Sequence, residues 1–286
     1  RDILHVLPQE YVIDTMDSIK DPVGLTGRRL EARVHLITVA TTAATNLVSC
    51  AEELGVEVDG IVYQGIASSI ATLEEDEKNL GVVCVDIGAT TTDIVVYHEG
   101  GVRHTATVGI GAASITNDIA VMLQVGIEEA EKIKKTYGSA KASMSSPELD
   151  FELPAKNGQI KRKISEHELS RYVEARMVEI LQLVMREVSR ADIKEKLTYG
   201  MVLTGGGSEL KNMVGLAQET INMPVRIGNP NNISGAIDVA SSPIYASAIG
   251  LAQWKNFGDD LSLIQLTESS IKGTVNKIKK IVSEFF

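Results

Sequence analysis

The stretch that decides the fold is Val82-Val83-Cys84-Val85-Asp86-Ile87-Gly88-Ala89-Thr90-Thr91-Thr92-Asp93-Ile94-Val95-Val96-Tyr97. It predicts two apolar strands joined by a tight polar turn, with a carboxylate at the end of the first strand and another at the start of the second. Small residues let a ligand approach the turn closely, and successive N–H groups in a turn form a concavity that binds anions. A strand-end carboxylate such as Asp86 can hold a metal ion or its water molecules. The stretch therefore predicts a site for a polyphosphate with Mg²⁺.

A second glycine-rich turn follows another apolar strand further along the chain. The strand is expected at 200–204, the turn is Gly205-Gly206-Gly207-Ser208, and a helix is expected at 209–220. Because N–H groups at a helix N-terminus point toward a bound anion, this turn is also suited to phosphate. One glycine-rich turn is typical of an ordinary loop. Two of them at strand ends, with a separate module between them in the sequence, favour nucleotide binding.

Composition and charge narrow the class of protein. The chain has 286 residues, of which 44% are hydrophobic and 23% charged, so we expect about two globular domains. The net charge of −10 argues against a large nucleic-acid surface. Cys50 and Cys84 lie far apart in apolar runs, which favours a reduced compartment and neither a disulfide nor a metal pair. No run reaches the roughly 18 apolar residues of a membrane span. The start at Arg1, without a signal pattern, indicates that an N-terminal portion is missing.

Hydrophobic periodicity predicts an α/β chain around the two turns. Before the first turn we expect strands at 3–14 (interrupted at Pro8), 30–38 and 56–64, helices at 41–54 and 66–73, and a solvated acidic loop at 74–77. After it we expect a strand at 102–108, helices at 112–123 and 128–135, an exposed loop at 139–147, a hairpin at 149–164, a helix from Ser165 to about 189, a strand at 225–227 and a helix at 245–254. Three strands followed by helices begin a ribonuclease-H-like α/β layer. The segment 112–195 is expected to form a small α+β unit inserted in that layer.

The last residues of the chain predict a basic amphipathic helix after a polar linker. Its apolar side chains fall three and four residues apart, at Ile271, Val275, Ile278, Ile281, Val282, Phe285 and Phe286. On or beside the other face lie Lys272, Lys277, Lys279 and Lys280. Such a helix suits the headgroup region of an anionic membrane, where each lysine contributes on the order of 1 kcal/mol. The same pattern is also typical of a helix that docks on its own domain or on a partner protein.

Both turns resemble nucleotide motifs of one superfamily. Asp86-Ile87-Gly88 with Thr92-Asp93 looks like the phosphate-2 loop of the actin/Hsp70/sugar-kinase superfamily, and residues 203–208 look like its adenosine motif. Within the superfamily the chain resembles the FtsA family of bacterial division proteins, over 8–14, 22–27, 34–38, 103–105, 117–120, 225–228 and the C-terminal helix. The resemblance covers nearly the whole chain. It implies an actin-like ATPase fold, α/β with ribonuclease-H-like layers, an inserted α+β subdomain and a C-terminal amphipathic helix.

The resemblance also implies a role for each residue of the site, with ATP and Mg²⁺ as cofactors. Asp86 would reach Mg²⁺ through water, and the β- and γ-phosphates would be held by Gly88, Ala89, Thr90 and Thr91. The base and sugar would lie against Gly205, Gly206, Gly207 and Ser208. Gln64 matches the position that orients the attacking water, although a solvated Gln at a strand end is an equal alternative. Glu131 and Lys134 match the pair that contacts ribose and adenine, and taken alone they are an ordinary charge pair on a helix face.

One departure from the superfamily pattern bears on activity. The superfamily usually has Gly where this chain has Ala89 and Thr90. A β-branched Thr disfavours a positive φ, so we expect a tighter turn or a looser hold on phosphate. We expect this departure to lower the rate of ATP hydrolysis more than the affinity for ATP. We therefore expect an ATP-binding protein with at most weak ATPase activity.

The family's domain scheme divides the chain into segments. The expected divisions are 1–31, the remainder of a 1C-like subdomain; 32–80, part of 1A; 81–111 and 196–230, the two parts of 2A; 112–195, subdomain 2B; 231–255, the last helix of 1A; 256–268, a linker; and 269–286, the membrane-targeting helix. In the family the C-terminal peptide of FtsZ docks on 2B, where Asn117, Arg171 and Arg176 are candidate polar lining residues.

The resemblance implies an actin-like protein that polymerises and tethers FtsZ filaments to the cytoplasmic membrane during bacterial cell division. Its partners would be FtsZ, anionic inner-membrane lipids, further copies of itself and other division proteins, and no nucleic acid is expected. It would be a peripheral protein on the cytoplasmic face of the membrane at the septum. Three other readings stay open: a pilus-assembly relative of the FtsA family, a sugar or acetate kinase, and an Hsp70-like chaperone.

Overall fold

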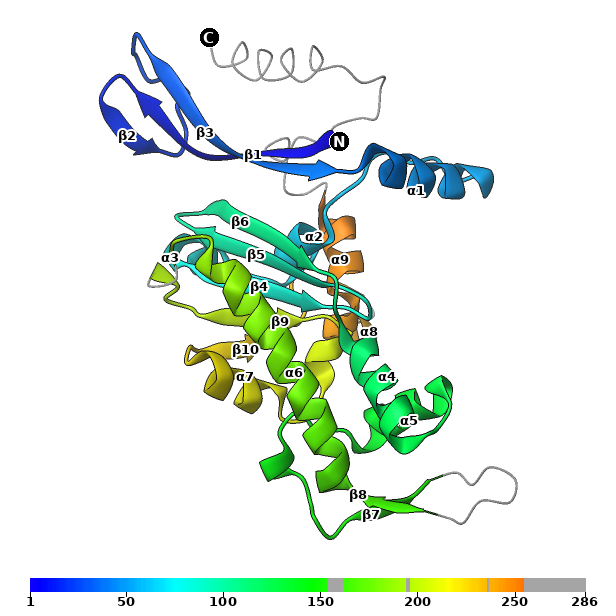
Figure 1. Cartoon of the computed structure of the whole chain (residues 1–286). Coiled ribbons are helices and arrows are strands. Elements are labelled where there is room, and N and C mark those ends of the chain that lie inside the picture. The colour runs from blue at the N-terminus through cyan, green and yellow to red at the C-terminus, as the bar shows by residue number, and fades with distance from the viewer. Residues whose placement is uncertain (154–161, 194–195, 236, 255–286) are drawn as a thin grey trace.

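A five-stranded sheet forms the centre of the molecule (Figure 1). The computed structural model describes residues 1–153, 162–193, 196–235 and 237–254. In order across the sheet the strands are β10 (Val225–Ile227), β9 (Met201–Thr204), β4 (Val82–Ile87), β5 (Thr92–His98) and β6 (Gly101–Val108). Strand β9 runs parallel to both of its neighbours, whereas β4, β5 and β6 form an antiparallel meander. The strand before the second glycine-rich turn therefore lies beside the strand before the first.

Both faces of β4 are covered, which explains its unbroken apolar sequence. Val82 and Cys84 join a hydrophobic cluster on one face, and Val83 and Val85 join a larger cluster on the other. None of these four side chains is more than 1% exposed. Because burial of one aliphatic side chain contributes about 1.5–3 kcal/mol, the strand that ends near Asp86 is firmly held.

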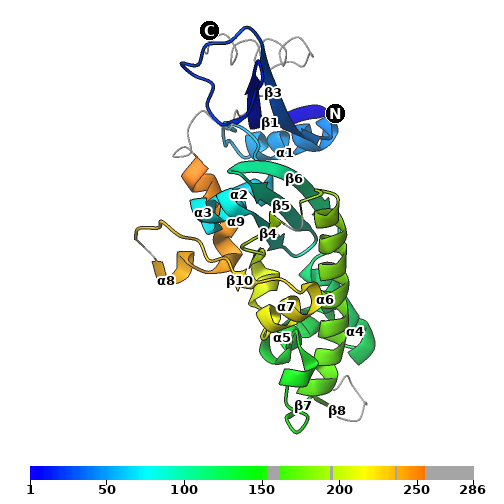
Figure 2. The same cartoon turned by 90° about the vertical axis from the view of Figure 1, so that its left-hand side faces the viewer.

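Helices cover the two faces of the sheet (Figure 2). On one face lie α2 (Gln64–Thr72), α3 (Glu75–Leu80) and α9 (Ala246–Gln253). On the other face lie α6 (Glu166–Ser189) and α7 (Met213–Ile221). The chain reaches α9 through α8 (Ile237–Ala240) and the 3₁₀ turn η4 (Pro243–Tyr245).

The long helix α6 follows the predicted pattern. Its buried residues include Leu169, Val173 and Ile180, which recur every three or four positions along the helix. Ser165 caps the helix as predicted, because its Oγ accepts a hydrogen bond from the N–H of Glu168 at 3.1 Å. The first turns of α6 lie away from the sheet and the last turns lie on it (Figure 1).

A small module is inserted between β6 and β9, at the lower end of the molecule in Figure 1. Besides α6 it contains α4 (Ala112–Leu123), α5 (Ile127–Tyr137), the 3₁₀ turn η1 (Ala142–Met144), β7 (Asp150–Glu152) and β8 (Lys163–Ser165). The rings of Tyr137 and Phe151 stack with their centroids 4.1 Å apart. The expected exposed loop at 139–147 is wrong in part, since Ser139 and Ala142 are buried.

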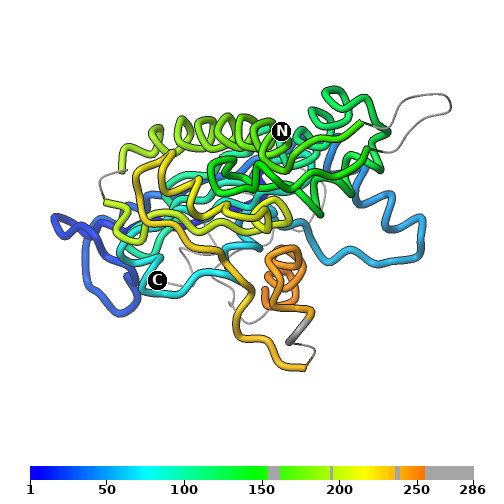
Figure 3. The backbone as a smooth tube through the Cα atoms, turned by 90° about the horizontal axis from the view of Figure 1, so that it is seen from below, coloured from blue at the N-terminus to red at the C-terminus, as the bar shows by residue number. Residues whose placement is uncertain are grey.

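A separate three-stranded sheet lies at the N-terminal end, in the order β2 (Met16–Ile19), β1 (Asp2–Ile13) and β3 (Leu30–Val39). Gln9 ties it to the central sheet, because its Nε2 donates to the carbonyl oxygen of Val102 at 2.7 Å. The register of β1 against β3 shifts after Pro8, which indicates a bulge there. The expected interruption of the strand at Pro8 is therefore wrong. Helix α1 (Thr41–Glu53) extends away from the rest of the molecule (Figures 1 and 3).

Two further expectations are corrected. The segment 56–63 forms no strand, and Gln64 opens α2, so the predicted strand at 56–64 is wrong. The acidic segment 74–77 is not a solvated loop but the start of α3. Glu77 is 6% exposed, and its carboxylate accepts from the N–H of Glu74 at 2.9 Å and from Arg226 Nε at 2.7 Å. Three successive carboxylates thus favour a helix N-terminus here, where the helix dipole stabilises negative charge.

The predicted linker and amphipathic tail, 256–268 and 269–286, lie outside the described residues. Among the helices that the structure describes, none has the length and apolar character needed to cross a membrane.

Candidate functional site

The two glycine-rich turns lie side by side. Asp86 on β4 and Thr204 on β9 are partners in the parallel register, so both strands end at the same edge of the sheet. Gly205 follows with a φ of 77°, and a Cβ there would come within 2.2 Å of Asp86 Oδ1. A Cβ on Gly207 would likewise meet the Ile87 side chain at 2.3 Å. The glycines therefore allow the second turn to lie close against the end of β4, from which the first turn starts.

The first turn presents free backbone donors to solvent. The N–H of Gly88 donates to the carbonyl oxygen of Thr91 at 2.9 Å and closes the turn. Within the described part of the chain, the N–H groups of Ala89, Thr90 and Thr91 donate to no acceptor. Ala89 and Thr90 are exposed. This arrangement fits the phosphate groups of a nucleotide, because adjacent unpaired N–H groups bind anions.

A β-branched Thr disfavours a positive φ, as noted above for the positions of Ala89 and Thr90. Neither residue has a positive φ. The backbone of the turn therefore does not require glycine at these two positions.

Helix α4 holds the first turn in place. The N–H groups of Ala112 and Ala113 donate to the carbonyl oxygens of Gly88 and Ala89, at 2.9 and 2.8 Å. A Cβ at Gly111 would lie 2.6 Å from both carbonyl oxygens, so the approach requires glycine. The first N–H groups of α4 are thus used by the turn itself, and the N–H groups of the turn remain for a ligand.

Asp86 is only 2% exposed, and one of its two carboxylate oxygens is heavily hydrogen-bonded. Oδ2 accepts from Gln64 Nε2 at 3.2 Å, from Ser247 Oγ at 3.0 Å and from Ser68 Oγ. In the residues that the structure describes, Oδ1 accepts no hydrogen bond and faces Gly205. A carboxylate oxygen that accepts no hydrogen bond, beside an anion-binding turn, fits a hydrated Mg²⁺, which takes one or two carboxylates together with phosphate oxygens.

The structure adds two serines that the sequence analysis missed. Ser68 lies four residues after Gln64 on α2, so both side chains fall on the same helix face. That spacing is a signal in the sequence once Gln64 is assigned to a helix. Ser247 comes from α9, and nothing in the sequence connects it with Asp86.

The second carboxylate of the opening stretch, Asp93, is also buried. It stands opposite Asp86 in the register of β4 and β5. Burial raises the pKa of Asp93, and the neighbouring Asp86 adds to this, whereas a hydrogen bond from Thr107 Oγ1 to Oδ1, at 2.6 Å, opposes it. Thr107 and Thr91 both donate hydrogen bonds to this carboxylate. Asp93 therefore helps to fix the position of the turn that contains Thr91.

Glu131 and Lys134 connect to the same turn. Lys134 Nζ lies 2.7 Å from the carboxylate of Glu131 and donates to Thr116 Oγ1 at 2.9 Å and to the carbonyl oxygen of Ala112 at 3.2 Å. Burial alone would raise the pKa of Glu131, but hydrogen bonds from Lys134 and Thr116 lower it. Since Ala112 also holds Gly88, this charge pair is more than an exposed helix-face pair.

The second turn differs from expectation in one respect. A 3₁₀ turn, η3 (Gly206–Glu209), follows Gly205, and α7 begins only at Met213. The expected helix at 209–220 therefore starts later. The free N–H groups at the start of α7 are consequently not those of the glycines. Gly206 is exposed, and Ser208 is buried with its Oγ donating to the carbonyl oxygen of Gly205 at 2.7 Å.

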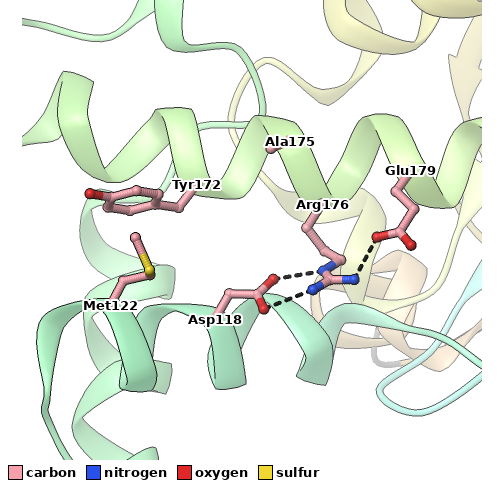
Figure 4. Close-up of a pocket in the computed structure, with 6 residues that line it drawn as sticks. All are labelled: Asp118, Met122, Tyr172, Ala175, Arg176 and Glu179. Atoms are coloured by element: carbon pink, nitrogen blue, oxygen red, sulfur yellow. Dashed lines mark hydrogen bonds and ion pairs between the residues drawn. The ribbon is translucent and has the colours of Figure 1, made fainter.

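A separate cavity of about 260 Å³ lies between α4 and α6 (Figure 4). It is lined by Asp118, Met122, Tyr172, Ala175, Arg176 and Glu179. Arg176 binds Asp118 at two points, Nε to Oδ2 at 2.6 Å and Nη2 to Oδ1 at 2.8 Å, and also reaches Glu179. Of the candidate polar lining residues, only Arg176 lines this cavity. Asn117 and Arg171 are exposed and are not part of the lining.

Comparisons with known proteins agree with this architecture. A family model described as "Cell division protein FtsA" matches residues 83–250, and one described as "SHS2 domain inserted in FTSA" matches residues 1–38. The "Cell division protein FtsA" of Pseudomonas aeruginosa is 40% identical over 252 residues, a match that covers 88% of this chain and 60% of that protein. The chain thus spans 60% of the length of this curated relative.

Solved structures share the fold at low sequence identity. MreB5 of Spiroplasma citri bound to ADP superposes with a TM-score of 0.63 at 20% identity, covering 78% of this chain and 68% of that one. The type IV pilus biogenesis complex PilM–PilN gives a TM-score of 0.60 at 17% identity, covering 87% and 66% of the two chains. The predicted actin-like ATPase fold is confirmed.

Proposed function

Because the chain belongs to the FtsA family of cell division proteins, we propose that it is an actin-like ATP-binding protein that polymerises and tethers FtsZ filaments to the cytoplasmic membrane. The observation that carries the nucleotide part is the exposed turn with three unpaired N–H groups, beside the glycines of the second turn and Asp86, whose Oδ1 accepts no hydrogen bond within the part of the chain that the structure describes. Free backbone donors, an available carboxylate oxygen and close-approach glycines together suit a nucleoside polyphosphate with Mg²⁺.

Each candidate residue then has a role that its surroundings support. Residues 88–91 would hold the β- and γ-phosphates, and Asp86 would hold the hydrated Mg²⁺. Gln64 is exposed, and its Nε2 lies 3.9 Å from the Cβ position of Gly88 in the turn, so it would orient a water molecule for attack on the terminal phosphate. Glu131 and Lys134 would meet the ribose and adenine beside the glycines at 205–207. Gln64 could orient a water molecule but could not accept its proton, so hydrolysis would be weak.

We assign the FtsZ peptide to the cavity between α4 and α6, in the segment 112–195 that corresponds to subdomain 2B. The cavity offers an aromatic ring, a thioether and a guanidinium, from Tyr172, Met122 and Arg176. This mixture suits a short peptide with apolar side chains and a carboxylate. Arg176 would exchange one of its acidic partners on the protein for the peptide carboxylate.

The C-terminal segment 269–286 would supply the membrane contact. Its apolar face and four lysines suit anionic lipid, as the sequence indicates. The protein would then be peripheral on the cytoplasmic face of the membrane at the septum, self-associate into filaments and contact other division proteins there.

The function is tested by reconstitution with the intact protein on vesicles that contain anionic lipid. Fluorescent FtsZ is mixed with the vesicles, and bound FtsZ is measured after sedimentation. We expect recruitment by the intact protein, and loss of both vesicle binding and recruitment in a version that ends at Gln253.

An Arg176→Ala variant separates the two contacts. It should still bind the vesicles but recruit at least about tenfold less FtsZ, a loss of about 1.4 kcal/mol. Arg186→Ala is the matched control, because Arg186 is on the same helix and outside the cavity. Equal vesicle binding by the version that ends at Gln253 would overturn the tether, and full recruitment by Arg176→Ala would overturn the docking site.

A further inference from the structure

Helix α9 reaches the candidate nucleotide site through a serine. Ser247, in the first turn of α9, lies 3.0 Å from Asp86 Oδ2 and 3.0 Å from Ser68 Oγ on α2. Ser68 is fully buried and also donates to Asp86 Oδ2. Two hydroxyls from helices far apart in the sequence therefore converge on one carboxylate oxygen.

A close helix contact makes this convergence possible. Gly250 lies three residues after Ser247, on the same face of α9, and a Cβ there would come within 1.7 Å of the carbonyl oxygen of Ala67. Glycine thus lets α9 pack directly on the backbone of α2. Without that approach, the short hydroxymethyl side chain of Ser247 would not reach Asp86.

The arrangement divides the two oxygens of Asp86 between protein and ligand. Ser68, Ser247 and Gln64 all donate to Oδ2. Each of these neutral donors restrains the orientation of the carboxylate. None of them brings a positive charge that would compete with Mg²⁺. Oδ1 accepts no hydrogen bond from the described residues and faces Gly205. The serines therefore restrict rotation of the Asp86 carboxylate about its Cβ–Cγ bond.

We propose that Ser68 and Ser247 are positioning residues of the nucleotide site, which orient Asp86 for Mg²⁺ and thereby make helix α9 part of that site. The inference rests on the proposed nucleotide binding and names residues that the family resemblance did not assign. Since Asp86 would act on the metal, removal of a serine hydroxyl weakens binding of the Mg²⁺ complex far more than binding of the free nucleotide.

Helix α9 also carries its own reporter. Trp254, which directly follows α9, is the one tryptophan of the chain. It is 7% exposed, and its ring centroid lies 5.6 Å from that of His5 on β1. A change in the position of α9 would alter the surroundings of Trp254, so its fluorescence reports on the coupling directly.

The experiment measures the affinity of the intact protein for ATP, with Mg²⁺ and with EDTA, by calorimetry and by Trp254 fluorescence. Ser68→Ala and Ser247→Ala should each lose about tenfold in affinity with Mg²⁺, equal to about 1.4 kcal/mol, and less than about twofold in EDTA. Ser247→Thr keeps a hydroxyl and should restore most of the affinity. The fluorescence change on ATP addition should diminish in Ser247→Ala.

Ser69→Ala is the matched control. Ser69 is buried on the same helix, but its Oγ contacts Ile66 and Tyr97 and not Asp86. It should keep the affinity and the Mg²⁺ dependence of the parent protein, and thermal denaturation checks that every variant folds. If Ser68→Ala fails to fold, Ser247→Ala and Ser247→Thr decide the question.

The outcomes distinguish two failures. If the parent protein binds no ATP with Mg²⁺, the proposed nucleotide site is wrong, and this inference falls with it. If the parent binds ATP but folded Ser247→Ala binds it equally well, or loses the same factor in EDTA, only the positioning role is overturned.

Discussion

Gly250 of α9 lies against the carbonyl oxygen of Ala67 of α2, so closely that a Cβ on Gly250 would come within 1.7 Å of that oxygen. Ser68 of α2 and Ser247 of α9 are 179 residues apart in the sequence. The two helices nevertheless pack backbone to backbone beside Asp86. This contact sets the distance between the last described helix and the candidate nucleotide site.

The first prediction tests this contact through stability. Gly250→Ala should lower the free energy of unfolding by about 1–3 kcal/mol, because the added methyl group forces α9 away from α2. Urea denaturation monitored by Trp254 fluorescence measures the change. Gly109→Ala is the control, since a Cβ there meets no atom within 4 Å, and it should leave stability within about 0.5 kcal/mol. An unchanged stability of Gly250→Ala would contradict the packing described for α9.

The second prediction concerns the ion pair in the cavity. The side chains of Arg176 and Asp118 are 28% and 30% exposed, so solvent screens the pair, although its two-point geometry favours it. A double-mutant cycle with Arg176→Ala and Asp118→Ala should give a coupling energy of about 0.5–1 kcal/mol. The exposed pair Lys132 and Glu129, with its atoms 3.9 Å apart, should give a coupling near zero. Equal coupling energies for the two pairs would show that the two-point geometry adds nothing.

The third prediction concerns acid stability. Burial lowers the pKa of His5 to about 4, from about 6.5 in the unfolded chain. Below pH 6.5 the unfolded chain therefore binds more protons than the folded protein, and stability falls as the pH falls toward 4. At pH 5 this residue alone should cost about 2 kcal/mol relative to pH 7.

His5→Gln isolates that contribution from the other titrating groups. The glutamine carbonyl can still accept the N–H of Tyr63, which lies 3.1 Å from His5 Nε2, but it does not titrate. The loss of stability between pH 7 and pH 5 should therefore be about 2 kcal/mol smaller in the variant, as measured by urea denaturation at each pH. Parallel pH profiles for the two proteins would rule out a buried neutral His5.

Much of the central sheet follows from local sequence. The turn at 88–91 is bounded by apolar strands, and the Ser165 cap and the periodicity of α6 are local patterns that the structure confirms. The burial of Glu77, by contrast, depends on a tertiary contact. The carboxylate of Glu77 is paired with Arg226, which lies 149 residues away, and no local pattern contains that partner.

The same limit applies to the site. Asp86 and the glycine-rich turns are visible because small residues and a carboxylate at strand ends form a local chemical pattern. Ser247 is not visible, because its role depends on how α9 packs on α2. The residues that hold a functional group in place are therefore harder to predict than the group itself.

The central claim is that Asp86 and the turn after it form the nucleotide site, and one measurement tests it most directly. The affinity of the intact protein for ATP with Mg²⁺ is compared with that of Asp86→Ala by calorimetry, with Asp76→Ala, an exposed carboxylate on α3, as the control. We predict at least about tenfold weaker binding for Asp86→Ala, equal to about 1.4 kcal/mol, and no change for Asp76→Ala. Unchanged affinity in folded Asp86→Ala would contradict the account.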